Sequence, residues 1–151
     1  MKKIVFVCHG NICRSPAAEF VFKEIIKKAR KEREYEVISR ATTTEGGGGR
    51  IYPPMREELK KRGIPFDINR RAQKISAREY EENDFVVCMD NRNLQYLDSM
   101  FGKPKQGKVY KLLDFTDSPR DVADPYYSDD YEGALNDIIV GCEAFFKYLE
   151  K

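Results

Sequence analysis

The chain has 151 residues, of which 41% are hydrophobic and 34% are charged, a composition typical of one soluble globular domain. Its 27 basic and 25 acidic residues give a net charge of +2, which argues against generic binding of nucleic acid or anionic membranes and leaves anion recognition to a few local groups. No apolar stretch approaches the roughly 18–20 residues of a membrane span, and four scattered cysteines are too few for a secreted disulfide scaffold, so we expect a protein of the reducing cytoplasm.

The first predicted element is a buried strand at residues 2–8, a short β-branched and aromatic run. A helix is predicted from Ser15, because apolar residues recur there every three or four positions and Pro16 suits its first turn. The remaining elements, in chain order, are a strand at 35–41, a loop at 42–54, a helix at 56–63, a short helix at 76–83 opened by a Ser76–Glu79 capping box, a strand at 84–90, a helix at 93–102, a strand at 108–113 and a last helix at 131–148.

This order of elements indicates the fold class. Apolar strands that alternate with amphipathic helices predict an α/β fold, a parallel sheet with helices on both faces. The four-glycine run at 46–49 is too short to be an interdomain linker, and no repeat is visible. We therefore expect one domain over residues 1–151.

The segment VCHGNICRSPAAEF, residues 7–20, spans the junction between the first strand and the first helix. Gly10 and Asn11 most readily accept left-handed backbone angles, so this loop can turn successive N–H groups inward around an anion. The helix N-terminus adds its positive dipole end, and Arg14 can hold two phosphate oxygens with a bidentate fork. The segment is therefore predicted to bind the phosphate group of a phosphomonoester.

The same field favours the thiolate form of Cys8, a nucleophile pointed at the phosphorus. Ser15 could donate its hydroxyl to the thiolate and stabilise it as a leaving group in a second step. Expelling an alkoxide or phenoxide also requires a proton from a general acid. We assign this acid to Asp124 in the segment DPYY, where Tyr126 and Tyr127 could supply one wall of an aromatic slot.

Several of these residues also have a plainer interpretation. Three other aspartates compete with Asp124, because any of them could simply cap the last helix: Asp121, Asp129 and Asp130. Cys13 could be a packing residue, and His9 is expected to face solvent, with phosphate contact as the alternative. Cys88 and Cys142 stand in apolar surroundings and are expected in the core.

VCHGNICRSPAAE, with ADPYY late in the chain, resembles the low-molecular-weight protein tyrosine phosphatases over nearly the whole chain. C-x5-R alone is moderately specific, whereas C-x4-C-R-S-P near the N-terminus combined with D-P-Y is a strong signal. The resemblance implies a flavodoxin-like fold with four parallel strands in the order 2-1-3-4. It also implies a two-step mechanism without metal or cofactor, a tyrosine-phosphorylated protein as substrate, and inorganic phosphate as product and inhibitor.

The resemblance also implies roles for single residues. Cys8 is expected to form the phosphocysteine, Arg14 to clamp the phosphate, and Asp124 to act first as acid and then as base for the hydrolytic water. Cys13 could form a reversible disulfide with Cys8 under peroxide. The loop residues expected around the phosphate are His9, Gly10, Asn11, Ile12, Cys13 and Ser15, of which Asn11 and Ser15 support the loop.

The chain departs from the family pattern after the second strand. Many family members carry there an aromatic residue that walls the substrate slot, whereas this chain has Glu45 followed by Gly46 to Gly49. A carboxylate and a flexible glycine run would hold the phosphotyrosine ring less well. We hypothesise that Glu45 disfavours acidic peptides.

Three other functions compete with this prediction. Arsenate reductases of the same fold need two further cysteines close together, whereas Cys88 has no near partner. Cys8 and Cys13 have the spacing of half a zinc site, but the other half is missing. A catalytically silent phosphate-binding module would lack the nucleophile or the acid, and the chain carries candidates for both.

Overall fold

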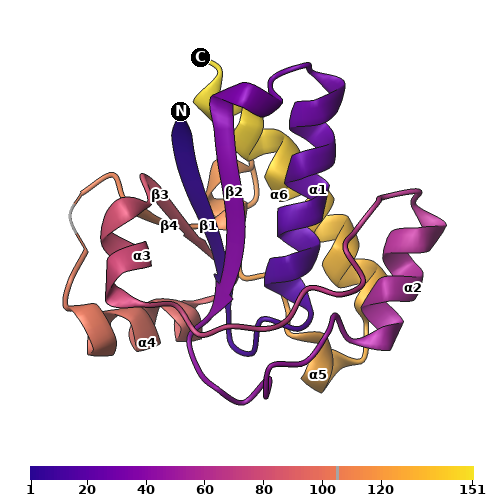
Figure 1. Cartoon of the computed structure of the whole chain (residues 1–151), viewed down its shortest axis with the longest axis horizontal. Coiled ribbons are helices and arrows are strands. Elements are labelled where there is room, and N and C mark those ends of the chain that lie inside the picture. The colour runs from indigo at the N-terminus through magenta and orange to yellow at the C-terminus, as the bar shows by residue number, and fades with distance from the viewer. Residues whose placement is uncertain (105) are drawn as a thin grey trace.

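The computed structural model describes residues 1–104 and 106–151, and a parallel sheet forms its centre (Figure 1). The strands are β1 (Lys2–Cys8), β2 (Tyr35–Ala41), β3 (Phe85–Cys88) and β4 (Val109–Lys111). They lie in the order β2-β1-β3-β4 and all pair in parallel, as predicted. The register sets Cys8 beside Ala41, and Val7 beside Cys88, so the carboxyl ends of three strands meet at one edge of the sheet.

Helices cover both faces of the sheet, which confirms the α/β fold (Figure 1). The helices are α1 (Arg14–Lys28), α2 (Pro53–Lys61), α3 (Ala77–Glu82), α4 (Asn91–Phe101), α5 (Pro125–Ser128) and α6 (Tyr131–Leu149), with 3₁₀ turns η1 (Glu32–Glu34) and η2 (Leu112–Phe115). α1 and α6 lie on one face and α3 and α4 on the other, while α2 packs on α6.

Alternate residues of β1 bury themselves on opposite faces, as the period of a strand requires. Phe6 packs into the larger apolar cluster with Phe22 of α1 and Phe145 of α6. Val5 and Val7 belong to a second cluster on the side of α3 and α4. Because both faces are covered, β1 is fully buried from Ile4 to Val7, and its carboxyl end lies at the sheet edge.

The structure corrects several predicted boundaries. α2 begins at Pro53 inside the segment predicted as a loop, because proline suits a first helical turn. β3 ends at Cys88 rather than at Asp90, since Asp90 caps α4. β4 covers only Val109–Lys111, and the polar stretch before α6 contains the short helix α5, which was not predicted.

The predicted capping box of α3 is confirmed. Ser76 Oγ accepts from the N–H of Glu79 at 3.1 Å, and Glu79 Oε1 accepts from the N–H of Ser76 at 3.1 Å. Among the described residues, no helix is both long enough and apolar enough to cross a membrane.

Candidate active site

The loop of residues 9–13 connects the end of β1 directly to α1. Asn11 adopts the left-handed conformation, with φ of 57°, as the sequence predicts. Gly10 has no positive φ, contrary to the prediction. It is instead approached closely by Gly46, because a Cβ at Gly46 would overlap the carbonyl oxygen of Gly10. The loop therefore uses one left-handed residue and one tight contact with the segment after β2.

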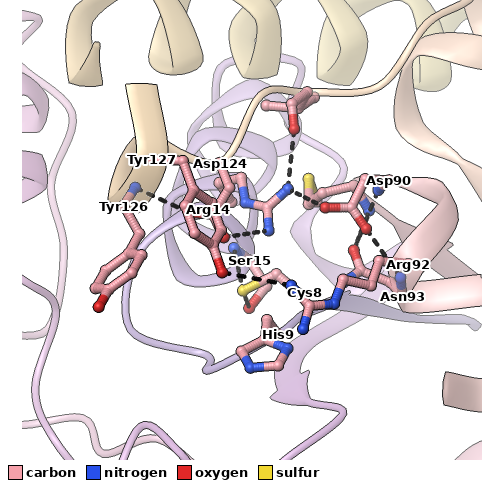
Figure 2. Close-up of polar contacts among 12 residues, drawn as sticks. Cys8, His9, Arg14, Ser15, Asp90, Arg92, Asn93, Asp124, Tyr126 and Tyr127 are labelled. Carbon is pink, nitrogen blue, oxygen red and sulfur yellow. Dashed lines mark hydrogen bonds and ion pairs between the residues drawn. The ribbon is translucent and has the colours of Figure 1, made fainter. Parts of the chain in front are cut away.

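The Cys8 thiol is surrounded by groups of its own loop (Figure 2). Its Sγ lies 3.0 Å from Ser15 Oγ, and the Ser15 N–H donates to the same sulfur at 3.3 Å. Asn11 Nδ2 donates to Ser15 Oγ at 2.8 Å, which orients the hydroxyl. Cys8 is only 3% exposed, and its sulfur faces the amino end of α1, where N–H groups favour negative charge.

Arg14 is buried, with 2% of its surface exposed, and is held by carboxylates that lie far away in the sequence. Its guanidinium donates to Asp90 Oδ2 at 2.7 Å and to the carbonyl oxygen of Val122 at 2.9 Å, and forms an ion pair with Asp124 at 3.3 Å. Burial opposes its charge, but Cys8, Asp124 and Asp90 outweigh this effect and raise the pKa of Arg14. Arg14 is therefore a fixed cation beside the thiol.

Asp90 was not predicted as a site residue. It follows β3 at the same edge of the sheet where Cys8 ends β1. An acidic residue directly after a strand predicted to run parallel to the first was the sequence feature that could have identified it. Its carboxylate has two partners, since Oδ1 accepts from the N–H of Asn93 at 2.8 Å and Oδ2 accepts from Arg14. The start of α4 thereby orients the Arg14 guanidinium.

Asp124 is the aspartate that the structure places beside Arg14. It caps α5, with Oδ1 accepting from the N–H of Tyr126 at 3.1 Å, while Oδ2 faces Arg14. The three competing aspartates have other places: Asp130 caps α6, Asp121 pairs with Lys111, and Asp129 ends α5 in a left-handed conformation.

A cavity of about 500 Å³ opens over the Cys8 sulfur. The sequence-predicted residues that line it are Cys8, His9, Gly10, Ile12, Cys13, Arg14, Glu45, Asp124, Tyr126 and Tyr127. Asn11 and Ser15 are fully buried and support the loop from behind. Tyr126 and Tyr127 are 81% and 71% exposed and stand at the rim. The structure thus brings the predicted residues together around one opening.

Four further residues of the cavity lining were missed: Gly46, Tyr52, Arg92 and Tyr131. Tyr52 stacks on Tyr131, with ring centroids 6.1 Å apart and an interplanar angle of 29°. The cavity therefore has aromatic surface at a place other than the Glu45 position. No local pattern distinguishes Tyr52 from an ordinary loop tyrosine.

Glu45 and His9 form a pair at the rim, with Glu45 Oε2 bound to His9 Nε2. His9 does not face solvent freely, because its side chain is 22% exposed and its ring packs against Tyr96 at a centroid distance of 5.7 Å. The Glu45 carboxylate therefore contacts the phosphate loop at His9, while 70% of the Glu45 side chain is exposed at the rim.

Arg70 is a half-buried arginine behind the loop. It donates to the carbonyl oxygen of Asn11 at 2.7 Å and to Asn11 Oδ1 at 2.5 Å. Asn11 also donates to Ser39 Oγ at 3.1 Å. These contacts satisfy the polar groups that the left-handed turn buries.

The chain has three cysteines besides Cys8. Burial raises the pKa of the thiols of Cys13, Cys88 and Cys142. All four cysteines are free, and Cys88 and Cys142 are fully buried, as expected for core residues. Within residues 1–104 and 106–151, no three His, Cys, Asp or Glu side chains gather as a metal site requires.

Comparison with known proteins gives consistent results. The family model for low molecular weight phosphotyrosine protein phosphatase matches residues 3–151. YfkJ of Bacillus subtilis, named a low molecular weight protein-tyrosine-phosphatase, is 32% identical over 153 residues, covering 100% of this chain and 97% of its own. PtpA of Staphylococcus aureus, with the same family name, is 33% identical over 152 residues, covering 100% and 96%.

Solved structures are also similar to this chain. The crystal structure of YfkJ from Bacillus subtilis superposes with a TM-score of 0.94, covering 99% of this chain and 95% of the other. The YwlE arginine phosphatase, a mutant with a phosphorylated active-site serine, is 29% identical with a TM-score of 0.85, covering 99% and 96%. The resemblance carried by the loop and DPYY motifs is confirmed, and the chain belongs to the low molecular weight phosphotyrosine protein phosphatase family.

Proposed function

We propose that residues 1–151 act as one phosphatase domain that hydrolyses phosphotyrosine in proteins, through a phosphocysteine on Cys8. The observation that carries this proposal is the meeting of three groups at the base of one cavity: the Cys8 sulfur, the Arg14 guanidinium and the Asp124 carboxyl. Together they supply a nucleophile, a fixed cation for the phosphate and a proton donor.

In the first step, the Cys8 thiolate attacks phosphorus, and an S–P bond forms as the bond from phosphorus to the tyrosine oxygen breaks. The loop N–H groups and Arg14 hold the phosphate oxygens, and Asp124 gives its proton to the departing phenoxide. The 3.3 Å contact between Arg14 and Asp124 places the carboxyl beside the phosphate clamp, where a bound phosphate dianion would take its place as the partner of Arg14 and favour the protonated acid. The products of this step are tyrosine and phosphocysteine.

In the second step, Asp124 takes a proton from water as the water oxygen attacks phosphorus. The S–P bond breaks, and Cys8 leaves as a thiolate that Ser15 stabilises through its hydroxyl at 3.0 Å. Inorganic phosphate is released, and it should inhibit by occupying the same loop. No metal ion or cofactor enters either step.

The substrate class follows from the depth and lining of the cavity. Four tyrosines line it, which suits an aromatic ring between the phosphate loop and the rim: Tyr52, Tyr126, Tyr127 and Tyr131. Cys8 is 3% exposed at the bottom, so a shorter phosphoserine should carry its phosphorus to the sulfur poorly. A reduced Cys8 is required throughout, which suits a reducing compartment such as the cytoplasm.

The test is hydrolysis of an aryl phosphate whose leaving group has a pKa near 10, in EDTA and reductant. Cys8→Ser should abolish activity, and Asp124→Ala should lower kcat about 10²- to 10⁴-fold. Asp121→Ala is the matched control, because Asp121 pairs with Lys111 and does not line the cavity. Activity retained by Cys8→Ser would contradict the mechanism.

The same preparation separates the alternative functions. Phosphotyrosine and phosphoarginine peptides should be compared, since a structural relative is an arginine phosphatase. A protein that binds phosphate without hydrolysing any phosphoester would be a binding module. Thiol-dependent arsenate reduction would indicate the related reductase, although the buried Cys88 in β3 offers no accessible partner thiol.

A further inference from the structure

Arg92 occupies the mouth of the cavity and has no part in the two steps described above. It lies in the first turn of α4, two residues after the Asp90 that orients Arg14. The start of α4 therefore carries both Asp90, which contacts the buried Arg14, and Arg92, which lines the cavity. Figure 2 shows Arg92 extending across the site towards Tyr127.

Two aromatic side chains hold the Arg92 guanidinium over the opening. Its Nη1 donates to the hydroxyl of Tyr127 at 3.4 Å, and its Cζ lies 6.0 Å from the centre of the Tyr96 ring. Tyr127 belongs to α5 and Tyr96 to α4, so the guanidinium lies between these two helices, which border the cavity.

Within the part of the chain that the structure describes, the charge of Arg92 has no carboxylate partner. Among the described residues, no Asp or Glu oxygen lies within 4.0 Å of its guanidinium nitrogens, whereas Arg14, the other arginine of the cavity lining, has Asp90 and Asp124 as partners. The acidic group of the rim, Glu45, is bound to His9 instead. A cation in the first turn also opposes the helix dipole, so helix stability does not explain this arginine.

We propose that Arg92 is a specificity-determining residue that binds the carboxylate of an acidic residue next to the phosphotyrosine, an inference that rests on the proposed function. In the proposed function, the phosphate itself is already bound by the loop N–H groups and by Arg14 at the base of the cavity. The chain that flanks the phosphotyrosine has to pass the rim, where the guanidinium is exposed and pairs with no carboxylate of the described residues. A planar guanidinium suits a carboxylate there because it can bind both oxygens.

The test compares phosphotyrosine peptides that differ only by Glu or Gln at the flanking positions. The measured quantity is the Glu-to-Gln ratio of kcat/KM within each variant, which cancels effects on chemistry. Arg92→Gln should lower this ratio about two- to fivefold, and Arg92→Lys should lower it less. Added salt should lower the wild-type ratio, because the rim is exposed.

Two further variants make the comparison specific. Arg33→Gln removes the same charge from exposed η1, at the opposite end of the strands, and should leave the ratio unchanged. Glu45→Gln should raise the ratio if Glu45 disfavours acidic peptides. Equal ratios in the wild type and Arg92→Gln, or an equal fall in Arg33→Gln, would overturn the proposal.

Other outcomes distinguish this proposal from the proposed function. If Arg92→Gln lowers hydrolysis of an aryl phosphate as much as that of the acidic peptide, Arg92 contacts the phosphate and the proposal is wrong. If the wild type hydrolyses aryl phosphate but no peptide, the protein-substrate part of the proposed function fails. The Glu-to-Gln ratio of Kd values, measured on Cys8→Ser and on Cys8→Ser with Arg92→Gln, then decides the role of Arg92.

Discussion

The four cysteines of this chain share one side-chain chemistry but do not share the same surroundings. Cys8 faces the amino end of α1, accepts a hydrogen bond from the Ser15 N–H and lies near the buried Arg14, surroundings typical of a nucleophilic cysteine. Cys13, on the same loop, is the residue before α1, and burial raises the pKa of its thiol. Surroundings, rather than residue type, therefore decide which sulfur is the nucleophile.

Alkylation should report this difference. Iodoacetamide at neutral pH should modify Cys8 first, and inorganic phosphate should protect it. Because burial raises the pKa of Cys13, this thiol stays protonated at neutral pH and should react only as the pH rises well above the range of an ordinary thiol. Peptide mass mapping measures the extent at each cysteine. Modification of Cys13 as fast as that of Cys8 would contradict the expected order.

At the scale of elements, the glycines after β2 have two different roles. Gly46 is needed for close packing, and Gly47 and Gly48 form a turn. Gly46 touches the Gly10 carbonyl, whereas Gly47 and Gly48 have φ values of 60° and 70° and face open space. The segment after β2 is thereby pressed onto the phosphate loop. The flexibility expected from four consecutive glycines is thus limited at Gly46.

Gly46→Ala should push the two segments apart and misplace the phosphate loop. We expect kcat/KM for an aryl phosphate to fall about 10- to 100-fold, because displacements on the order of 1 Å have such effects on catalysis. Gly47→Ala is the matched control: it costs about 1–2 kcal/mol of stability through its left-handed backbone but meets no neighbour, so kcat/KM should be retained. Equal losses of activity in both variants would show that the contact with Gly10 is unimportant.

At the scale of the whole molecule, α6 packs in the core and against η2, which precedes the segment that leads to Asp124. Gly141 of α6 lies against η2, where a Cβ would come 2.5 Å from Leu112 Cγ. This close approach lets Leu112 fill the cluster that also holds Phe6 and Phe145. The position of α6 therefore depends on a residue without a side chain.

Gly141→Ala should destabilise the fold by overpacking, by about 1–3 kcal/mol. For a chain of this length, each kcal/mol lowers Tm by about 2–4 °C, which thermal unfolding followed by circular dichroism measures. Val140→Ala, at an exposed neighbouring position, should change the free energy of unfolding by less than about 0.5 kcal/mol. A Gly141→Ala variant as stable as the wild type would mean that η2 moves away from the added methyl group without loss of stability.

The sequence by itself determined the parts of this protein that depend on short stretches of chain. The strand, loop and helix around Cys8, Arg14 and Ser15 follow from the types of neighbouring residues in the sequence, because backbone angles and helix starts are local properties. The alternation of apolar strands and amphipathic helices likewise predicted the sheet, and the family resemblance predicted its strand order and singled out Asp124.

Only the tertiary structure decided which distant residues complete the site. Asp90 lies 76 residues from Arg14, and Arg70 lies 59 residues from Asn11, yet each is in hydrogen-bond contact. Tyr52 and Arg92 line the cavity because α2 packs on α6 and β3 lies beside β1. Such contacts arise from strand order and helix packing, which bring the ends of separate elements to one sheet edge. No spacing along the chain encodes these distances.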